Sequence, residues 1–249
     1  MRAGTQQGKP HRPQTSSGER GRNGRLIYTQ SGTPRSKDLA ALLDELRALI
    51  QEKSISRKLP GEPDYVLASG KHSRYYCDTK KVTLSPAGAL LTGEILFTLL
   101  DGKVDAVGGL QLGATFIATA VALVSGQHGR PIYGFTVREQ QKKHGTKENI
   151  ATSFSPNGRD LLEPGRPVAI VDDVVTEGGS ILQAVRAVQE RGCNIVSVVS
   201  MVDRNQGGGD HLRDLGLPYF ALFNAVEPGI LTTNDRLLDR PEIHRIPSA

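Results

Sequence analysis

Residues 167–182, PVAIVDDVVTEGGSIL, constrain the fold of this 249-residue chain more than any other segment. The apolar run at 168–171 is typical of a parallel strand buried on both faces of a sheet. Asp172 and Asp173 follow that run, and a turn at 176–180 then leads into a helical pattern. The segment therefore predicts a strand, a turn and a helix. Both acids should lie at the carboxyl end of the strand, where open α/β sheets bind ligands.

The turn has the composition of a phosphate-binding site: Thr176, Glu177, Gly178, Gly179 and Ser180. Glycines let a backbone approach an anion closely, and a helix N-terminus offers unpaired N–H groups and a favourable dipole. The two hydroxyls can add further donors. We therefore expect phosphate to bind at this turn, while the preceding acids suit sugar hydroxyls or a metal-bound sugar.

A solvated acidic turn at an ordinary strand-to-helix crossover is the alternative interpretation. Adjacent acids alone favour that alternative, but the ordered series of buried strand, acids, Thr, paired glycines and Ser favours a phosphate site. The GK[ST] signature of P-loop NTPases is absent, and the spacing differs from the GxGxxG of dinucleotide-binding folds. Both of those classes are therefore disfavoured.

Strand and helix patterns alternate through most of the remaining chain. A helical pattern begins near Ser36, residues 65–79 predict a small N-terminal hood element of two short strands around a turn, and Pro86 stands at a helix start. Further predicted elements are strands at 104–107, 132–137, 195–202 and 219–223 and a helix at 114–124. This order predicts an α/β fold with a mostly parallel central sheet, flanking helices and right-handed crossovers.

The N-terminal tail accounts for the net charge of +5. The first 37 residues contain eight basic residues and one acid, which leaves a net charge of −2 for the rest. Large apolar residues are scarce there, so we expect a disordered tail at 1–36 ahead of a domain at 37–249. A basic tail can touch RNA or acidic surfaces, but we interpret it as a non-targeting extension or a misassigned start. The domain at 37–249 has no excess of basic residues for binding nucleic acid, so we expect no specific nucleic-acid partner.

The sequence shows no membrane-spanning segment, signal peptide or disulfide pattern. No apolar run approaches the roughly 20 residues that span a bilayer, and the first residues contain no signal-peptide core. Cys77 and Cys193 are too few for a disulfide framework, so we expect both to be packing residues and the protein to be cytoplasmic.

Residues 139–160 form a long polar segment within an otherwise compact pattern. Lys142, Lys143, His144 and Lys147 lie near its start. A loop of this length in a compact domain commonly covers an active site, and its cations suit a polyanion. We therefore expect a long flexible active-site loop; a mobile surface excursion is the alternative.

Four parts of the chain resemble the orotate phosphoribosyltransferases, a branch of the type I phosphoribosyltransferases. They are SGKHSRYYCDTKKVTLSP at 69–86, GGLQLGATFIA at 108–118, VREQQKKHG at 137–145, and the segment at 167–182 together with VDR at 202–204. The resemblance implies the type I fold and a pentosyltransferase reaction. Ribose 5-phosphate would pass from magnesium-bound 5-phosphoribosyl 1-diphosphate to orotate, giving orotidine 5′-monophosphate and pyrophosphate for UMP biosynthesis. It also implies a homodimer that shares loops across its interface.

The resemblance also implies a set of catalytic residues. Arg138, Lys142 and His144 match loop residues that close over pyrophosphate, often in the neighbouring subunit's site. Asp172 and Asp173 match the acids that hold the ribose hydroxyls and the metal shell around them. We take Lys142, His144, Asp172 and Asp173 as the catalytic candidates, with the magnesium ion carried by the diphosphate and no metal site in the protein.

Substrate-binding residues follow from the same match. The predicted contacts to phosphoribosyl diphosphate in the strand and turn are Asp172, Asp173, Val174, Val175, Thr176, Glu177, Gly178, Gly179 and Ser180. Thr176 and Arg204 match the contacts to orotate, whose flat carboxylate suits a guanidinium that bonds bidentately. A salt bridge between Arg204 and Asp203 is the alternative. Gly108, Gly109 and Gly113 resemble the pyrophosphate-side loop.

Three positions depart from the pattern of some family members. Glu139, Ala68 and Leu112 stand where those members have basic residues. Lys143 and Lys71 are the candidates to replace two of the missing contacts. The departures bear on contacts to the leaving group more than on the reaction.

Two other functions stay open at this point. One is a phosphoribosyltransferase for a purine or another base, and the other is a non-catalytic regulator that senses phosphoribosyl diphosphate. Arg204 argues against a neutral purine, and the cation-rich loop argues against a sensor. The length leaves no room for a fused orotidylate decarboxylase barrel, so we expect a separate protein to catalyse the next step.

Overall fold

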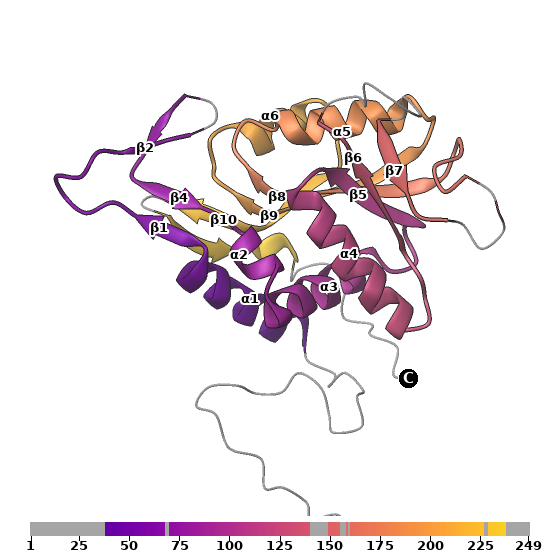
Figure 1. Cartoon of the computed structure of the whole chain (residues 1–249), viewed down its shortest axis with the longest axis horizontal. Coiled ribbons are helices and arrows are strands. Elements are labelled where there is room, and N and C mark those ends of the chain that lie inside the picture. The colour runs from indigo at the N-terminus through magenta and orange to yellow at the C-terminus, as the bar shows by residue number, and fades with distance from the viewer. Residues whose placement is uncertain are drawn as a thin grey trace, which may run out of the picture. The chain divides into compact units, whose positions relative to one another are not determined.

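A seven-stranded sheet forms the centre of the molecule (Figure 1). The computed structural model describes residues 38–67, 70–139, 149–154, 158, 160–226 and 229–237. The strands of the main sheet are β5 (Ala106–Leu110), β6 (Tyr133–Val137), β7 (Ile150–Thr152), β8 (Pro167–Val175), β9 (Asn194–Asp203), β10 (Tyr219–Val226) and β11 (Ile230–Thr233). Their order is β11-β10-β9-β8-β5-β6-β7, and only the edge strands β11 and β7 pair antiparallel with their neighbours. The predicted mostly parallel α/β sheet is confirmed.

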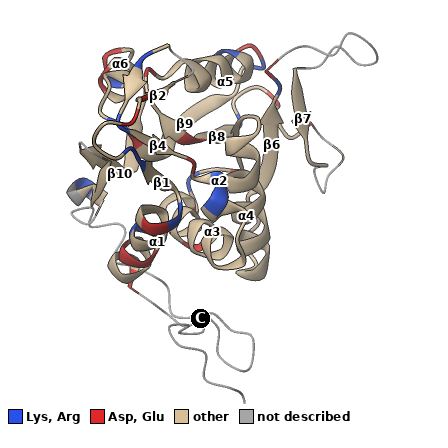
Figure 2. Cartoon of the chain, turned by 60° about the vertical axis from the view of Figure 1, so that its left-hand side comes forward, with Lys and Arg blue, Asp and Glu red and all other residues tan. Residues whose placement is uncertain are grey.

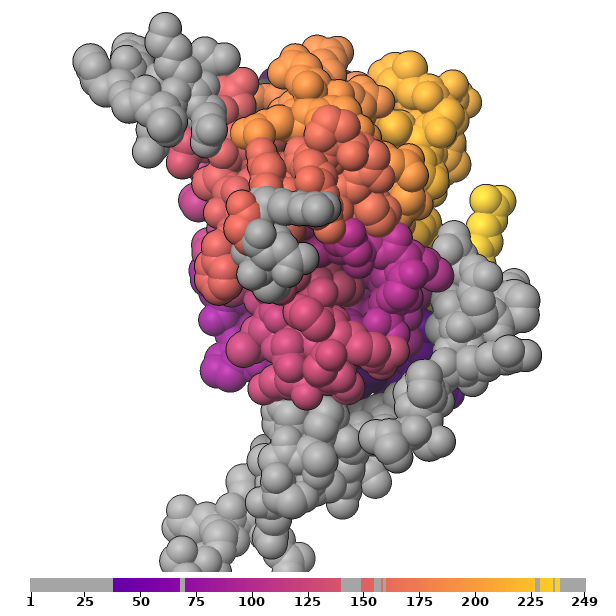
Figure 3. Space-filling model, turned by 90° about the vertical axis from the view of Figure 1, so that its right-hand side faces the viewer, coloured from indigo at the N-terminus to yellow at the C-terminus, as the bar shows by residue number. Residues whose placement is uncertain are grey.

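Helices cover both faces of this sheet. The described helices are α1 (Leu39–Lys53), α2 (Lys80–Thr83), α3 (Pro86–Leu100), α4 (Gly113–Gln127), α5 (Gly179–Gln189), α6 (Gly208–Asp214) and a 3-10 helix at Asp235–Leu237. α5 and α6 lie on one face, and α1, α3 and α4 lie on the other. Figure 3 shows the molecule from the side, with the orange surface around α5 above and the pink surface around α4 below. None of the described helices is both long and apolar enough to span a membrane.

Two helix starts follow directly from side-chain capping. The Asp38 carboxylate accepts a hydrogen bond from the backbone N–H of Ala40 at the start of α1. Ser85 accepts one from the N–H of Gly88 at 3.1 Å, and Pro86 occupies the first position of α3. These caps satisfy N–H groups that have no partner within the helix, so both helices begin close to their predicted positions.

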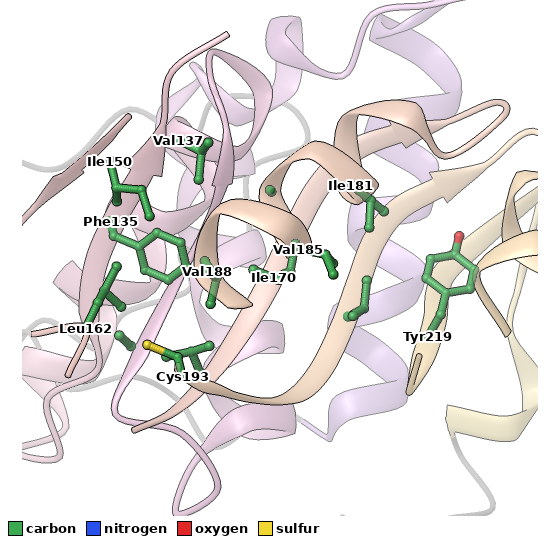
Figure 4. Packing of buried hydrophobic residues seen from close by; sticks show 14 of the residues in the cluster. Phe135, Val137, Ile150, Leu162, Ile170, Ile181, Val185, Val188, Cys193 and Tyr219 are labelled. Atoms are coloured by element: carbon green, nitrogen blue, oxygen red, sulfur yellow. The ribbon is translucent and has the colours of Figure 1, made fainter. Parts of the chain in front are cut away.

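The apolar side of α5 packs on the sheet (Figure 4). Ile181, Val185 and Val188 belong to one buried cluster with Ile170 of β8 and Phe135 of β6, and each is at most 4% exposed. Burying a side chain of this kind stabilises the fold by about 1.5–3 kcal/mol. This packing holds the N-terminus of α5, and with it the preceding turn, at the end of β8.

The hood contains two strand pairs, where the sequence predicts one hairpin. Its strands are β1 (Ile55–Arg57), β2 (Tyr65–Val66), β3 (His72–Ser73) and β4 (Tyr75–Cys77). β2 pairs with β3 and β1 pairs with β4, both antiparallel. The chain changes partners at Arg74, whose guanidinium donates to the carbonyls of Lys58 and Leu59. It also pairs with Asp64 at 2.9 Å, so one side chain holds the loop between β1 and β2.

β8 is longer than its apolar run predicts. The strand continues to Val175, so both acids lie within it and not after it. The pairing of β8 with β9 continues beyond the two acids and places Asp172 opposite Ser200. The pairing of β8 with β5 stops at Ile170. The sheet therefore opens between β5 and β8. These are also the strands from which the chain winds in opposite directions, the place where α/β sheets bind ligands.

Other predicted boundaries also change. Ile150, Ala151 and Thr152, predicted as loop, form the edge strand β7, with Ile150 opposite Val137. The predicted strand at 104–107 shifts to Ala106–Leu110 and so includes its two glycines. α6 and β11 have no counterpart in the sequence prediction. The predicted tail and residues 140–148 of the predicted loop lie outside the described residues.

Candidate active site

Asp172 lies on the α5 side of β8 and is only 5% exposed. The Ser180 hydroxyl donates to its Oδ2, and the backbone N–H of Asp173 donates to its Oδ1 at 2.9 Å. Burial and, to a smaller extent, the neighbouring charge of Asp173 raise the pKa of Asp172, the Ser180 hydrogen bond lowers it, and the net pKa is about 7. Near neutral pH this carboxyl can therefore hold or release a proton.

Asp173 faces the helices on the other side of the sheet. Its Oδ2 accepts a hydrogen bond from Thr79 Oγ1 at 3.1 Å and lies 3.7 Å from Lys80 Nζ. Lys80 also pairs with Asp78 at 2.9 Å. Burial lowers the pKa of Lys80, but the hydrogen bond to Asp78 and the charge of Asp173 outweigh that effect and raise it. Figure 2 shows the resulting proximity, with the red end of β8 close to the blue α2. The site thus places one ammonium group beside the less buried acid.

The first residue of α4 must be small because it abuts this acid. A Cβ atom built on Gly113 would lie 2.4 Å from Asp173 Cγ. The backbone at the N-terminus of α4 therefore lies directly against this carboxyl group. Gly113 therefore has a steric reason to lack a side chain, and its predicted place beside pyrophosphate stays a prediction.

The turn after β8 leads directly into an uncapped helix. Gly178 has a φ of 85° and no side chain caps the N-terminus of α5. The N–H groups of that first turn are therefore available to an anion. The backbone N–H of Gly208, the first residue of α6, donates to Thr176 O at 2.9 Å, and Lys71 Nζ lies 2.6 Å from Glu177 Oε1. The turn is thus supported on one side by α6 and on the other by the hood.

Arg204 follows β9 and is 5% exposed. Its Nη2 donates to Ser73 Oγ at 2.8 Å and its Nε donates to Tyr75 Oη at 3.1 Å. Among the described residues no carboxylate lies within ion-pair distance of it. Asp203 instead accepts hydrogen bonds from Asn205 N and Tyr219 Oη, so the alternative of an Arg204–Asp203 salt bridge does not hold. A buried cation without an acid suits an anionic ligand.

Arg138 does not join this group of side chains. It lines a pocket of about 160 Å³ together with Asn149 and with Gln183 and Arg186 of α5. Lys142 and His144 lie outside the described residues, so their predicted roles remain predictions. The structure therefore brings together residues 172–180 and Arg204, and leaves the base of the loop beside α5.

Sequence reasoning missed several residues that touch the predicted site. Thr79 and Lys80 contact Asp173, and Ser73 and Tyr75 contact Arg204. All four belong to the segment at 69–86 that carries the family resemblance. The paired lysines after Thr79 were the available signal, but nothing local indicates that they face a strand end 94 residues later.

The two cysteines are free and buried. Burial raises the pKa of Cys77 to about 12, so its thiol stays protonated and unreactive. The described residues contain no group of three or more His, Cys, Asp and Glu that could hold a metal ion. Two carboxylates can still complete the shell of a magnesium ion that arrives with substrate phosphates.

The fold and the site define a phosphoribosyltransferase. Residues 86–214 match the family model described as a phosphoribosyl transferase domain. The orotate phosphoribosyltransferase of Aquifex aeolicus is 41% identical over 185 residues, which cover 74% of this chain and 96% of that protein. The orotate phosphoribosyltransferase of a Nostoc species is 39% identical over 194 residues, which cover 78% and 88% of the two chains.

Solved structures agree with these relatives. The Mycobacterium tuberculosis H37Rv orotate phosphoribosyltransferase, crystallised with 5-phospho-alpha-D-ribosyl 1-diphosphate, is 29% identical with a TM-score of 0.55. The match covers 74% of this chain and 89% of that one. This chain therefore belongs to the orotate phosphoribosyltransferase family, which consists of pentosyltransferase enzymes.

Proposed function

We propose that the chain transfers ribose 5-phosphate from 5-phosphoribosyl 1-diphosphate to orotate, giving orotidine 5′-monophosphate and pyrophosphate for UMP biosynthesis. One observation carries this proposal: Arg204 is buried, forms no ion pair with any described acid, and lies next to the carboxylate pair of β8 and the glycine turn that follows it. Arg204 supplies a charge for an anionic base, and a neutral purine has no group to use it. The relatives named above carry the same activity in their names.

Each part of the site has a role in substrate binding. The uncapped N–H groups of α5 bind the 5′-phosphate, because a helix N-terminus binds anions through its donors and dipole. Asp172 and Asp173 hold the ribose hydroxyls from opposite faces of β8. The titratable proton of Asp172 lets it act either as acceptor or as donor toward a hydroxyl.

Magnesium ions fit this donor set as part of the substrate. Mg²⁺ prefers one or two carboxylates, waters and substrate phosphates to an all-protein cage, which agrees with the two acids on β8. When bound, the ion neutralises charge on the diphosphate. Asp173, held by Thr79 and Lys80 and less buried than Asp172, is the acid that would complete that ion's shell.

The reaction develops negative charge on the departing pyrophosphate and positive charge on the ribosyl carbon. Preorganised donors at the leaving group can each contribute on the order of 3–4 kcal/mol to the transition state. Lys80 is one such cation on the described part of the chain, and Arg138, Lys142 and His144 of the loop supply the others.

We also propose a homodimer in which the loop serves the neighbouring subunit's site. Arg138 supports this arrangement because it lies beside Gln183 and Arg186 on the α5 side, apart from Asp173 and Arg204. A cytoplasmic location is proposed as well, since two free buried thiols suit a reducing compartment.

The direct test mixes purified protein with orotate, Mg²⁺ and phosphoribosyl diphosphate and follows the loss of orotate absorbance. We expect turnover with orotate and none with adenine or hypoxanthine. Arg204→Ala should raise KM for orotate at least tenfold, because a hydrogen bond to a charged group is worth about 1.5–3 kcal/mol, and should leave KM for phosphoribosyl diphosphate nearly unchanged. Turnover with a purine alone would identify a purine enzyme, and tight diphosphate binding without any turnover would identify a sensor.

A further inference from the structure

The ring of Tyr75 lies between the arginine of the site and the C-terminal hairpin. Its side chain is fully buried, and the Arg204 guanidinium carbon lies 4.2 Å from the ring centroid. Gly229, in the turn between β10 and β11, packs against the ring so closely that an added Cβ would lie 2.6 Å from Tyr75 Cδ2. Arg57 and Gln51 both donate to the carbonyl of Gly229, at 3.1 and 3.0 Å, which holds that turn in place.

The hydrogen bonds of Arg204 leave one end of its guanidinium available. Arginine has five N–H donors, and here Nε donates to Tyr75 Oη at 3.1 Å. The two Nη2 donors reach Ser73 Oγ at 2.8 Å and the Tyr75 carbonyl at 3.3 Å. Within the described part of the chain, the Nη1 donors have no partner.

The Ser73 hydroxyl is oriented to accept a hydrogen bond from Arg204. Its hydroxyl donates to the Tyr75 carbonyl at 2.8 Å, so its lone pairs face the Arg204 Nη2 and the Tyr75 N–H. The hood strand therefore fixes three of the five donors and the plane of the guanidinium. Little freedom remains for Arg204 to change its direction before the substrate binds.

We propose that Tyr75, assisted by Ser73 and backed by Gly229, is a positioning residue that aims Nη1 of Arg204 at the carboxylate of the base substrate. This inference rests on the proposed use of orotate. It replaces the expected bidentate grip of Arg204 with a contact through Nη1, because Nη2 and Nε are already engaged. Tyr75 acts through Arg204 and contributes no group to the reacting atoms.

Tyr75→Phe tests the proposal, because it removes the Nε acceptor and keeps the ring beneath the guanidinium. We expect KM for orotate to rise about tenfold, with kcat and KM for phosphoribosyl diphosphate within about twofold of the wild type. Tyr133→Phe is the matched control. It removes a phenol at the first position of β6, the opposite end of the parallel strands, and should change neither KM.

A double-mutant cycle separates positioning from a general structural role. In an Arg204→Ala background, Tyr75→Phe should change KM for orotate less than twofold, because the residue through which it acts is gone. Additive effects of the two substitutions would overturn the proposal. An unchanged KM for orotate in Tyr75→Phe, or equal rises for both substrates, would overturn it too.

Gly229→Ala provides an independent variant that leaves Tyr75 and Arg204 intact. The new methyl group should displace the ring and raise KM for orotate severalfold. Gly216→Ala is its control, since Gly216 has a similar φ of 75° but no atom within 4 Å of the added Cβ. Equal rises in KM for orotate in the two glycine variants would mean that backbone strain alone causes the effect, and would contradict the proposed packing of Gly229 against Tyr75. Wild-type protein that does not use orotate would instead overturn the proposed function itself.

Discussion

Two adjacent acids on one strand occupy different environments. Successive side chains of a strand point to opposite faces of the sheet, so Asp172 faces Ser180 of α5 while Asp173 faces Thr79 and Gly113. Asp172 is buried in the core and Asp173 lies beside an ammonium group. A doubled acid in the sequence therefore produces one titrating group and one paired group.

Replacing Asp172 should change how stability depends on pH. Burial raises its pKa from 3.8 to about 7, so its contribution to stability is full below about pH 4 and is lost as the pH rises through about 7. Asp172→Asn cannot ionise. We expect its free energy of unfolding to exceed that of the wild type by about 1–3 kcal/mol at pH 8 and by much less at pH 4.5. Urea denaturation at both pH values measures this difference.

Asp214→Asn is the control for that experiment, because Asp214 is exposed at the end of α6. It should show no such change between pH 4.5 and pH 8. An Asp172→Asn protein that is less stable than the wild type at pH 8 would contradict the assigned direction. Its activity should fall in either case, since the variant loses a ribose-binding carboxylate.

At the scale of elements, the start of α4 and the hood enclose the end of β8. The hood supplies Ser73 and Tyr75 to Arg204, Lys71 to Glu177, and leads into the Thr79 hydroxyl that holds Asp173. A short segment thus contacts the base, phosphate and ribose parts of the proposed site.

Two glycines on α4 separate a local effect on the helix from an effect on the site. A Cβ at Gly113 would overlap the Asp173 carboxyl group, whereas a Cβ at Gly126 meets no atom within 4 Å. Gly126→Ala should stabilise the helix by up to about 1 kcal/mol and leave activity unchanged. Gly113→Ala should lower kcat/KM for phosphoribosyl diphosphate at least tenfold, by displacing Asp173. Equal activity of the two variants in steady-state kinetics would show that Asp173 tolerates the displacement.

At the scale of the whole molecule, the proposed loop sharing predicts complementation between inactive variants. Lys142→Ala removes a loop cation and Asp172→Asn removes a ribose-binding acid, so each protein alone should be nearly inactive. In a mixed dimer, one site would combine an intact loop with intact acids. After subunit exchange at equal concentrations, we expect about a quarter of the wild-type activity, because half of the dimers are mixed and half of their sites are intact.

A protein that uses its own loop gives the opposite result. Every site in the mixture would then keep one damaged part, and the activity would stay at the level of the two variants measured separately. Size-exclusion chromatography with light scattering provides the control, because a monomer at assay concentration would rule out the shared site. Mixing each variant with itself sets the background.

Local patterns in the sequence were sufficient for the main elements. Apolar runs, Pro86 and the paired glycines at the start of α5 each act within a few residues, and the α/β class built from them is confirmed. The motif at residues 167–182 also placed the two acids and the glycine turn near the carboxyl end of a central strand, while their contacts to substrate stay predictions. The family followed from the same local segments, because they carry the residue pattern that the family shares.

The tertiary structure alone decided which distant residues complete the site. Thr79 meets Asp173 across 94 positions, and Tyr75 meets Arg204 across 129. The edge strands β7 and β11 and the length of β8 likewise depend on neighbouring strands that satisfy their backbone groups. Periodicity reports which face of an element is buried, but it contains no information about the partner that covers it. Folding supplies that partner, and with it the orientation of Arg204.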